Sequence, residues 1–248
     1  MDLAGCLADG TPDAWGRRVI LRRLHAGDTR DLDTTALPTV TYLLESDTDR
    51  IGANDFQASA ETYVPREIDA TLEELLTAAD RLQAGEPFRE PIDRVLNAGS
   101  SVGGARPKAT VTVNGGGPAL IAKLSTPTDT YPVVKGEAVA MELARRAGLN
   151  VAATERVTVL DRDVLLVDRF DRTPGTHRRR AMVSALTLLG LAEMQARYAT
   201  YPDLVQTVID EFEDAADTVG LTDLDRRLLW RRAFLHPYAF EGYGPAPA

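Results

Sequence analysis

The sequence predicts an α+β fold in which a small antiparallel sheet, accompanied by one helix, lies between helical segments. Two observations lead to this prediction. Short stretches rich in β-branched residues occur in pairs around turn sequences between residues 109 and 170, and such pairs are typical of antiparallel hairpins. Apolar residues at helical spacing dominate the chain before and after that region.

The chain before the predicted sheet is expected to be mainly helical. Helices are predicted over residues 9–25, 71–84 and 90–99. The second is the clearest, because Thr71 can cap it, Glu74 stands three residues further on as in a capping box, and Gly85 follows its end. Residues 31–64 show no dominant period, so no order of elements is predicted for them.

The predicted sheet consists of two strand pairs separated by a helix. Its strands are expected over residues 109–113, 119–124, 151–160 and 163–170. A triple glycine at 115–117 is typical of a hairpin turn in the first pair, and a turn from Asp161 to Asp163 joins the second. The helix between the pairs, residues 134–149, has apolar residues at helical spacing and ends at Gly148.

The C-terminal part of the chain is predicted to be helical and then irregular. Helical patterns cover residues 181–198, 203–219 and 223–235. Residues 236–248 have neither a helical nor a strand period. We therefore expect a loose tail there.

Composition excludes several classes of protein. The chain is 44% hydrophobic and 26% charged, as in ordinary globular domains, and no apolar run is long enough to span a bilayer. The first ten residues lack the features of a signal peptide, and the single Cys6 cannot form an internal disulfide, which indicates a cytoplasmic protein. A net charge of -9 argues against a general nucleic-acid binder.

The positions of the lysines are the first indication of a binding site. Of the 28 basic residues only three are lysines, Lys108, Lys123 and Lys135, and the first of them lies in the glycine-rich segment GSSVGGARPKATVTV at residues 99–113. Backbone amides of glycine-rich loops and a nearby ammonium group are what proteins use to hold phosphates. The segment therefore indicates a phosphate-binding loop or, alternatively, a simple turn between strands.

The surrounding elements decide between phosphate-binding motifs. Gly99 and Gly104 have the Walker spacing, but Ala105 stands where that motif needs a lysine and a strand follows instead of a helix. The order of glycine-rich loop, strand, strand lysine (Lys123) and helix glutamate (Glu137) matches a kinase small lobe. Alone, Lys123 would be an edge-strand lysine and Glu137 an ordinary first-turn acid; their order favours the kinase interpretation.

Several segments of the chain resemble one family. SSVGGARPKATV, IAKL, EAVAMELARRAGLNVA, LLVDRFDR and SALTLLG, with LADGTPDAWGRRVILRR upstream, resemble the HipA-like serine/threonine kinases, the toxins of bacterial type II toxin–antitoxin pairs. The resemblance covers most of residues 7–235. It implies a partial N-terminal subdomain over residues 1–98, a nucleotide-binding small lobe over 99–175, the helical start of an incomplete large lobe over 176–235, and an irregular tail over 236–248.

The resemblance also implies roles for individual residues. Ser101 matches the loop serine whose autophosphorylation expels the loop and inactivates such kinases. The nucleotide-binding positions it implies are Gly103, Gly104, Ala105, Arg106, Lys108, Lys123, Glu137, Asp168, Arg169 and Phe170, the last three as a hinge that meets adenine through its backbone. It further implies ATP and Mg²⁺ as cofactors, a HipB-like antitoxin as partner, DNA contact only through that antitoxin, and no membrane association.

The catalytic part of the family pattern is not found. An aspartate for the substrate hydroxyl, an asparagine for metal and a second metal-binding aspartate are expected after Arg232, where the chain reads AFLHPYAFEGYGPAPA. The resemblance therefore implies a chain truncated at both ends, with no catalytic or metal-binding residue assigned. Three interpretations follow: an impaired protein kinase, a non-catalytic nucleotide- or antitoxin-binding protein, or a decayed or frameshifted reading frame.

Overall fold

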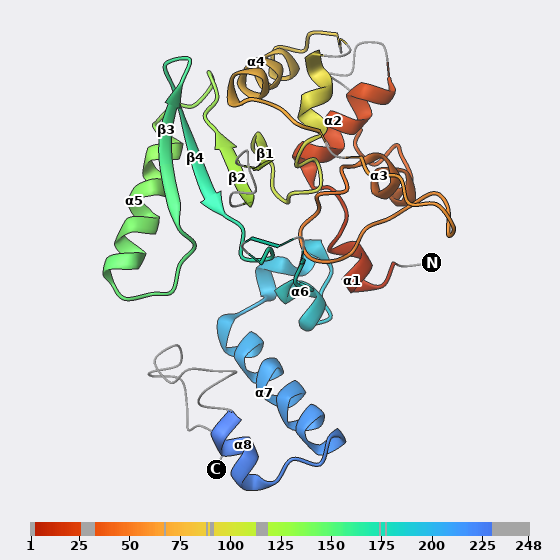
Figure 1. Ribbon diagram of the computed structural model, residues 1–248, viewed down its shortest axis with the longest axis vertical. Helices are drawn as coiled ribbons and strands as arrows, with labels where there is room; N and C mark the ends of the chain where they lie inside the picture. The colour runs from red at the N-terminus through yellow and green to blue at the C-terminus, as the bar shows by residue number, and fades with distance from the viewer. Residues whose placement is uncertain are drawn as a thin grey trace. The chain divides into compact units, whose positions relative to one another are not determined.

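The computed structural model describes residues 3–25, 33–66, 68–87, 89, 92–112, 119–173, 175–176 and 178–229. The chain divides into two compact units, Met1–Met182 and Val183–Ala248 (Figure 1). In the first unit the elements are α1 (Gly5–Ala8), α2 (Ala14–Leu24), α3 (Thr39–Glu45), α4 (Leu72–Gln83), the 3₁₀ helix η1 (Ile92–Asn97), β1 (Lys108–Thr112), β2 (Ala119–Leu124), α5 (Val133–Arg146), β3 (Thr154–Val159) and β4 (Arg162–Asp168).

The helices before the sheet follow the predicted pattern in three places. α2, α4 and η1 fall within the predicted ranges, whereas the short α1 and α3 were not predicted. The capping box of α4 is confirmed: the Thr71 hydroxyl accepts a hydrogen bond from the Glu74 amide at 3.2 Å, and the Glu74 carboxylate accepts one from the Thr71 amide at 2.9 Å. Gly85 follows the helix with φ +75°, a conformation that glycine adopts without strain.

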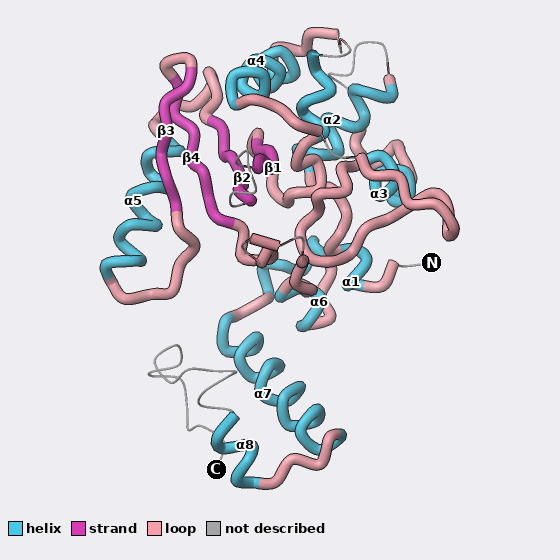
Figure 2. The backbone as a smooth tube through the Cα atoms, viewed as in Figure 1, coloured by secondary structure: helices cyan, strands magenta, loops and turns pink. Residues whose placement is uncertain are grey.

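The predicted antiparallel sheet is confirmed, with four strands in the order β1-β2-β4-β3 (Figure 2). Leu160 and Asp161 link β3 to β4, and both have positive φ, as the tight two-residue hairpin turn requires. The predicted glycine turn at 115–117 lies outside the described residues. The α+β fold class that the sequence predicts is therefore correct.

The alternation of β2 separates a core face of the sheet from a site face. Leu120, Ala122 and Leu124 are buried, and the last two pack with Trp15 of α2 and Leu75 of α4 in the main hydrophobic core. Because side chains alternate along a strand, Ile121 and Lys123 point to the opposite face. The helix α5 contacts β3 and β4, and it runs alongside these strands in Figure 1.

The second unit contains α6 (Ala185–Leu188), the 3₁₀ helix η2 (Glu193–Tyr198), α7 (Tyr201–Thr218) and α8 (Asp223–Leu229). The single helix predicted over 181–198 is wrong. Ser184 caps α6, and Gly190 adopts φ +64° directly after it, a left-handed conformation that ends the helix. The predicted tail at 236–248 lies outside the described residues. None of the helices in the described ranges combines the length and hydrophobicity that a bilayer span needs.

Candidate functional site

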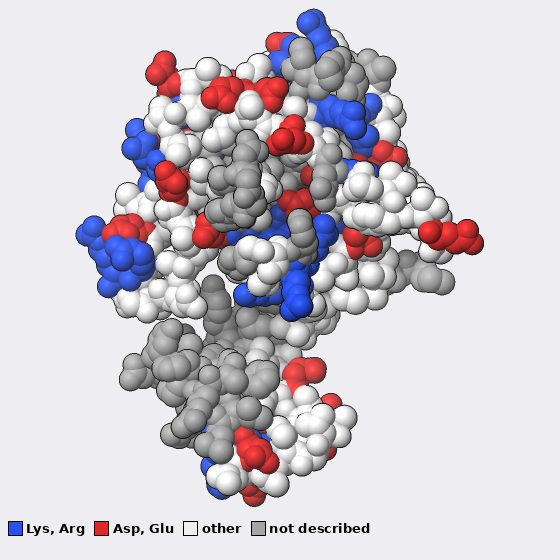
Figure 3. Space-filling view, viewed as in Figure 1, with Lys and Arg blue, Asp and Glu red and all other residues white. Residues whose placement is uncertain are grey.

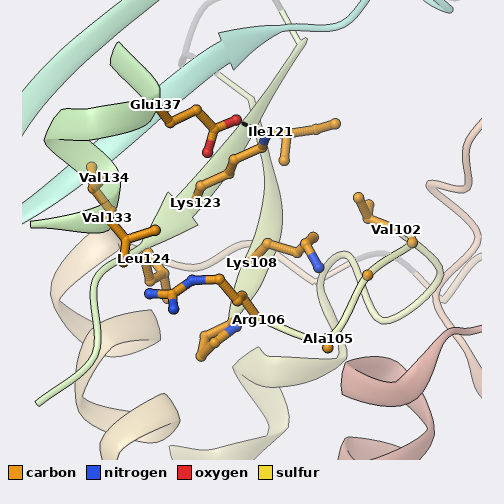
Figure 4. A pocket seen from close by; sticks show the side chains of 13 residues that line it. Val102, Ala105, Arg106, Lys108, Ile121, Lys123, Leu124, Val133, Val134 and Glu137 are labelled. Carbon is orange, nitrogen blue, oxygen red and sulfur yellow. Dashed lines mark hydrogen bonds and ion pairs between the residues drawn. The ribbon is translucent and has the colours of Figure 1, made fainter. Parts of the chain in front are cut away.

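A cavity of about 450 Å³ lies between the glycine-rich loop, β2 and the start of α5 (Figure 4). Its walls are residues 102–108, three residues of β2 and three of α5. All the predicted loop positions from Gly103 to Lys108, together with Lys123 and Glu137, contribute to it. The structure therefore brings these predicted site residues into one place.

Lys123 and Glu137 form an ion pair at the edge of the cavity. Lys123 points away from the core because it alternates with buried Ala122 and Leu124 on β2. Glu137 faces it from the second turn of α5, and its carboxylate accepts a hydrogen bond from the Lys123 ammonium. Both side chains remain 36% exposed. The pair is thus accessible to a ligand, and the glutamate holds the ammonium in position.

Lys108 and Lys123 stand directly opposite each other across the β1–β2 ladder. Directly opposed residues of an antiparallel pair have their side chains on the same face, and like charges there are unfavourable. Glu137 pairs with the Lys123 ammonium, whereas the Lys108 ammonium has no hydrogen-bond partner among the described residues and is offset only by the nearby charge of Asp13. An anion in the cavity would offset this repulsion.

Lys108 is the more unusual of the two lysines. Its residue is only 8% exposed, and its Nζ has no hydrogen-bond partner within the described part of the chain. Burial lowers the pKa of this ammonium to about 8, and the neighbouring charge of Lys123 acts in the same direction. A buried polar donor without a partner is costly. The Lys108 ammonium is therefore a donor available to a ligand oxygen.

The glycine-rich loop lies against the Lys108 side chain and is hydrogen-bonded to residues at the start of α2. At Gly104, which has φ +109°, an added Cβ would lie 2.8 Å from the Lys108 Nζ, so glycine lets the backbone approach the ammonium. The Gly104 amide donates to Asp13 at 2.5 Å, and the Ala105 carbonyl accepts from Arg18 at 2.8 Å. These contacts fix the loop to the start of α2.

Arg106 anchors the other end of the loop. Its guanidinium donates to both carboxylate oxygens of Asp129 at 2.7 Å. Burial opposes ionisation of Asp129, but hydrogen bonds from Arg106 and Thr126 outweigh it and hold the pKa of this carboxyl below its ordinary value. Arg106 thus has a protein partner in this arrangement, and its contact with nucleotide stays a prediction.

Ser101, the predicted phosphorylation position, is buried beside the cavity. Its residue is 4% exposed, and its hydroxyl has no hydrogen-bond partner among the described residues. A phosphate adds up to two negative charges and three acceptor oxygens, which this buried position cannot accommodate unless the loop moves. Phosphorylation of Ser101 stays a prediction, and it requires displacement of the loop.

The predicted hinge residues Asp168, Arg169 and Phe170 are not among the residues that line the cavity. The fully buried guanidinium of Arg169 pairs instead with Asp49 at 2.8 Å and Asp171 at 2.9 Å. Phe170 is 65% exposed, and Asp168 ends β4. Their contact with adenine through the backbone stays a prediction.

Sequence reasoning missed the residues that hold the loop from outside. Asp13 and Arg18 lie in DGTPDAWGRR, a segment that was noted only for its resemblance, and Asp129 lies in a loop without a motif. Aligning the two predicted strands would have revealed the opposed lysines. Among the residues that the structure describes, no cluster of three His, Cys, Asp or Glu side chains is placed to hold a metal ion.

The chain is thus an α+β protein in which a glycine-rich loop and a lysine of β2 lie next to a glutamate of the following helix, α5. Residues 100–236 match the family model of the HipA-like C-terminal domain, and the chain belongs to this family.

A solved structure shares the fold. It is the HipA of Shewanella oneidensis MR-1, described as a toxin–antitoxin system complex of HipA, HipB and its operator DNA. The two chains are 23% identical with a TM-score of 0.51, and the match covers 81% of this chain and 48% of that one. This chain therefore spans about half the length of its structural neighbour. No match was found among curated proteins.

Proposed function

We propose that this chain binds ATP through its phosphates, as the nucleotide-binding lobe of a HipA-like serine/threonine kinase. The observation that carries the proposal is the pair of opposed lysines, Lys108 and Lys123, in a cavity next to a glycine-rich loop. Among the residues that the structure describes, Lys123 has a carboxylate partner and Lys108 has none. A triphosphate would give the Lys108 ammonium a negatively charged partner with acceptor oxygens.

The residues of the cavity fit a nucleotide phosphate better than a metal ion. Lys108 and Lys123 would hold phosphate oxygens, and Glu137 would keep Lys123 aligned. Magnesium bound with ATP supplies charge neutralisation, and proteins hold it with one or two carboxylates plus phosphates. The nearby carboxylates of Glu137 and Asp129 are engaged by Lys123 and Arg106. We therefore assign no metal ligand.

Phosphate transfer to a protein serine is the finer part of the proposal. It needs an aspartate that orients the substrate hydroxyl, and no described residue lining the cavity is an aspartate. The second candidate, a non-catalytic nucleotide-binding protein, is favoured by that lining.

The structural neighbour was solved with HipB and operator DNA, so a HipB-like antitoxin is the proposed partner. In Figure 3 acidic and basic side chains are interspersed on the face in view, and the net charge is -9; DNA contact would then come through the antitoxin.

The test is incubation of the chain with magnesium and γ-labelled ATP, alongside calorimetric titration of ATP. Label on the wild-type chain and none on Ser101→Ala supports kinase activity with Ser101 as its site. Binding without transfer supports the non-catalytic alternative. Absence of ATP binding contradicts the proposed function.

Binding of ATP should depend on pH through Lys108. Because burial lowers the pKa of this ammonium to about 8, its positive charge is present below that pH and is lost as the pH rises through it. We expect the affinity to fall roughly tenfold between about pH 8 and 9.5, since the charged fraction of Lys108 falls from about one half to a few per cent over that range. Titration calorimetry over this range measures the change.

The matched control is Lys108→Arg, because a guanidinium stays charged throughout this range. Its affinity should change little with pH. A wild-type affinity that is equally flat would contradict the prediction that titration of Lys108 controls ATP binding in this range.

A further inference from the structure

The first residue of the α2 segment makes an unusual contact with the glycine-rich loop. Asp13 is the N-cap of α2, but its side chain makes no capping hydrogen bond to its own helix. Its carboxylate instead accepts a hydrogen bond from the Gly104 amide at 2.5 Å. The same oxygen lies 2.8 Å from where a Cβ on Gly103 would be. The Asp13 side chain therefore binds the glycine-rich loop instead of capping α2.

The start of α2 is pressed against the loop over several residues. The Trp15 amide donates to the Gly104 carbonyl at 3.3 Å, and Arg18 donates to the Ala105 carbonyl at 2.8 Å. A Cβ on Gly16 would come within 1.7 Å of the Ser100 carbonyl oxygen, so only glycine allows this approach. Because these contacts are independent of the carboxylate, the loop stays beside α2 when the charge of Asp13 is removed.

The Asp13 carboxylate takes the partners that a phosphate oxygen would take. Backbone amides of a glycine-rich loop are phosphate ligands in many proteins, and here one of them is occupied by a carboxylate. The negative charge of Asp13 also acts on Lys108, where it opposes the effect of burial. The Lys108 ammonium has no hydrogen-bond partner among the described residues, so this charge is its main compensation.

We propose that Asp13 is a resident anion of the loop: its carboxylate occupies the Gly104 amide and competes with the phosphates of a nucleotide. The inference rests on the proposed function, because it names the group that regulates the same cavity. Gly104 lines the cavity, whereas Asp13 does not, so the competition is for the Gly104 amide: a phosphate oxygen that accepts from this amide displaces the carboxylate from it. Asp13 thus sets a lower affinity than the loop and the lysines would otherwise give.

The test compares the affinity of wild type and Asp13→Asn for ATP and for inorganic tripolyphosphate by titration calorimetry. Asparagine keeps the N-cap preference and the size of the side chain but removes the charge. Since charge-assisted hydrogen bonds are about twice as strong as neutral ones, we expect Asp13→Asn to bind both probes roughly five- to tenfold more tightly. Asp13→Ser, also a favoured N-cap, is the second variant if Asp13→Asn does not fold.

The matched control is Asp69→Asn, which removes one negative charge at an exposed aspartate and should leave both affinities unchanged. If wild type binds and Asp13→Asn binds no more tightly, Asp13 only orders the loop and the inference is overturned while the proposed function stands. If neither wild type nor the Asp13 variants bind either probe, the cavity is not an anion site and both are overturned. Tighter binding of tripolyphosphate as well as ATP locates the effect at the phosphates.

Discussion

Replacement of Lys123 by alanine is expected to weaken ATP binding by about 10- to 100-fold. A hydrogen bond between an ammonium and a phosphate oxygen is worth about 1.5–3 kcal/mol, and that energy is lost with the side chain. The variant also leaves the Glu137 carboxylate without its partner at the edge of the cavity, where its negative charge repels phosphate. Titration calorimetry with ATP measures the loss.

The sequence provides a close control in Lys135→Ala. Lys135 is also a lysine of this region, but it is 55% exposed, pairs with Asp163 at 3.4 Å, and does not line the cavity. Its removal should leave ATP affinity within about twofold of wild type, because exposed ion pairs contribute little. Equal losses in the two variants would mean that only general charge attracts the nucleotide, and the assigned site would be wrong.

Arg169→Ala is expected to lower the free energy of unfolding of the first unit by about 3–5 kcal/mol. Arg169 is fully buried between the carboxylates of Asp49 and Asp171, and it also donates to the Arg50 carbonyl at 2.7 Å. Removal of one partner from a buried ion pair leaves uncompensated charge in the interior. Urea denaturation followed by circular dichroism measures the change; Arg178→Ala, at an exposed position, is the control and should differ little from wild type.

The same network predicts a loss of stability in acid. Burial opposes ionisation of Asp171, but hydrogen bonds and charge from Arg169 outweigh it, and the pKa of this carboxyl is lowered in the folded state. Its contribution is therefore complete above the unfolded pKa of about 4 and is lost as the pH falls through the folded value. Arg169→Ala should reduce this acid dependence. An unchanged dependence in the variant would assign it to other carboxylates.

Local sequence signals predicted the elements that depend on local interactions. The capping box at Thr71 and Glu74, the strand β2 and the hairpin between β3 and β4 are all formed by residues close together in the chain. The turn of that hairpin lies at Leu160 and Asp161, one residue earlier than the predicted turn from Asp161 to Asp163. The helix predicted through Gly190 failed because apolar spacing continues across a glycine that ends the helix. Periodicity reports which face is apolar, and it does not report where the backbone reverses.

The candidate site was predictable where its residues follow a fixed order. Lys123 and Glu137 were paired from the order of strand and helix, and the structure shows their contact. Asp13 and Asp49 act on positions about 90 and 120 residues away along the chain. No local pattern marks such partners, because carboxylates in loops look alike until the fold brings one of them to a particular amide or guanidinium.

The register of β1 against β2 predicts that β1 is more stably paired when an anion is bound in the cavity than when none is bound. Sliding β1 by a single residue would turn Lys108 toward the core and Ala109 toward the cavity, so the two lysines share the cavity only in the observed register. β1 is one of the two edge strands of the sheet, and the repulsion between Lys108 and Lys123 opposes its pairing with β2. A multivalent anion bound to both Lys108 and Lys123 would link β1 to β2. Amide hydrogen exchange along β1 would then slow when the anion binds.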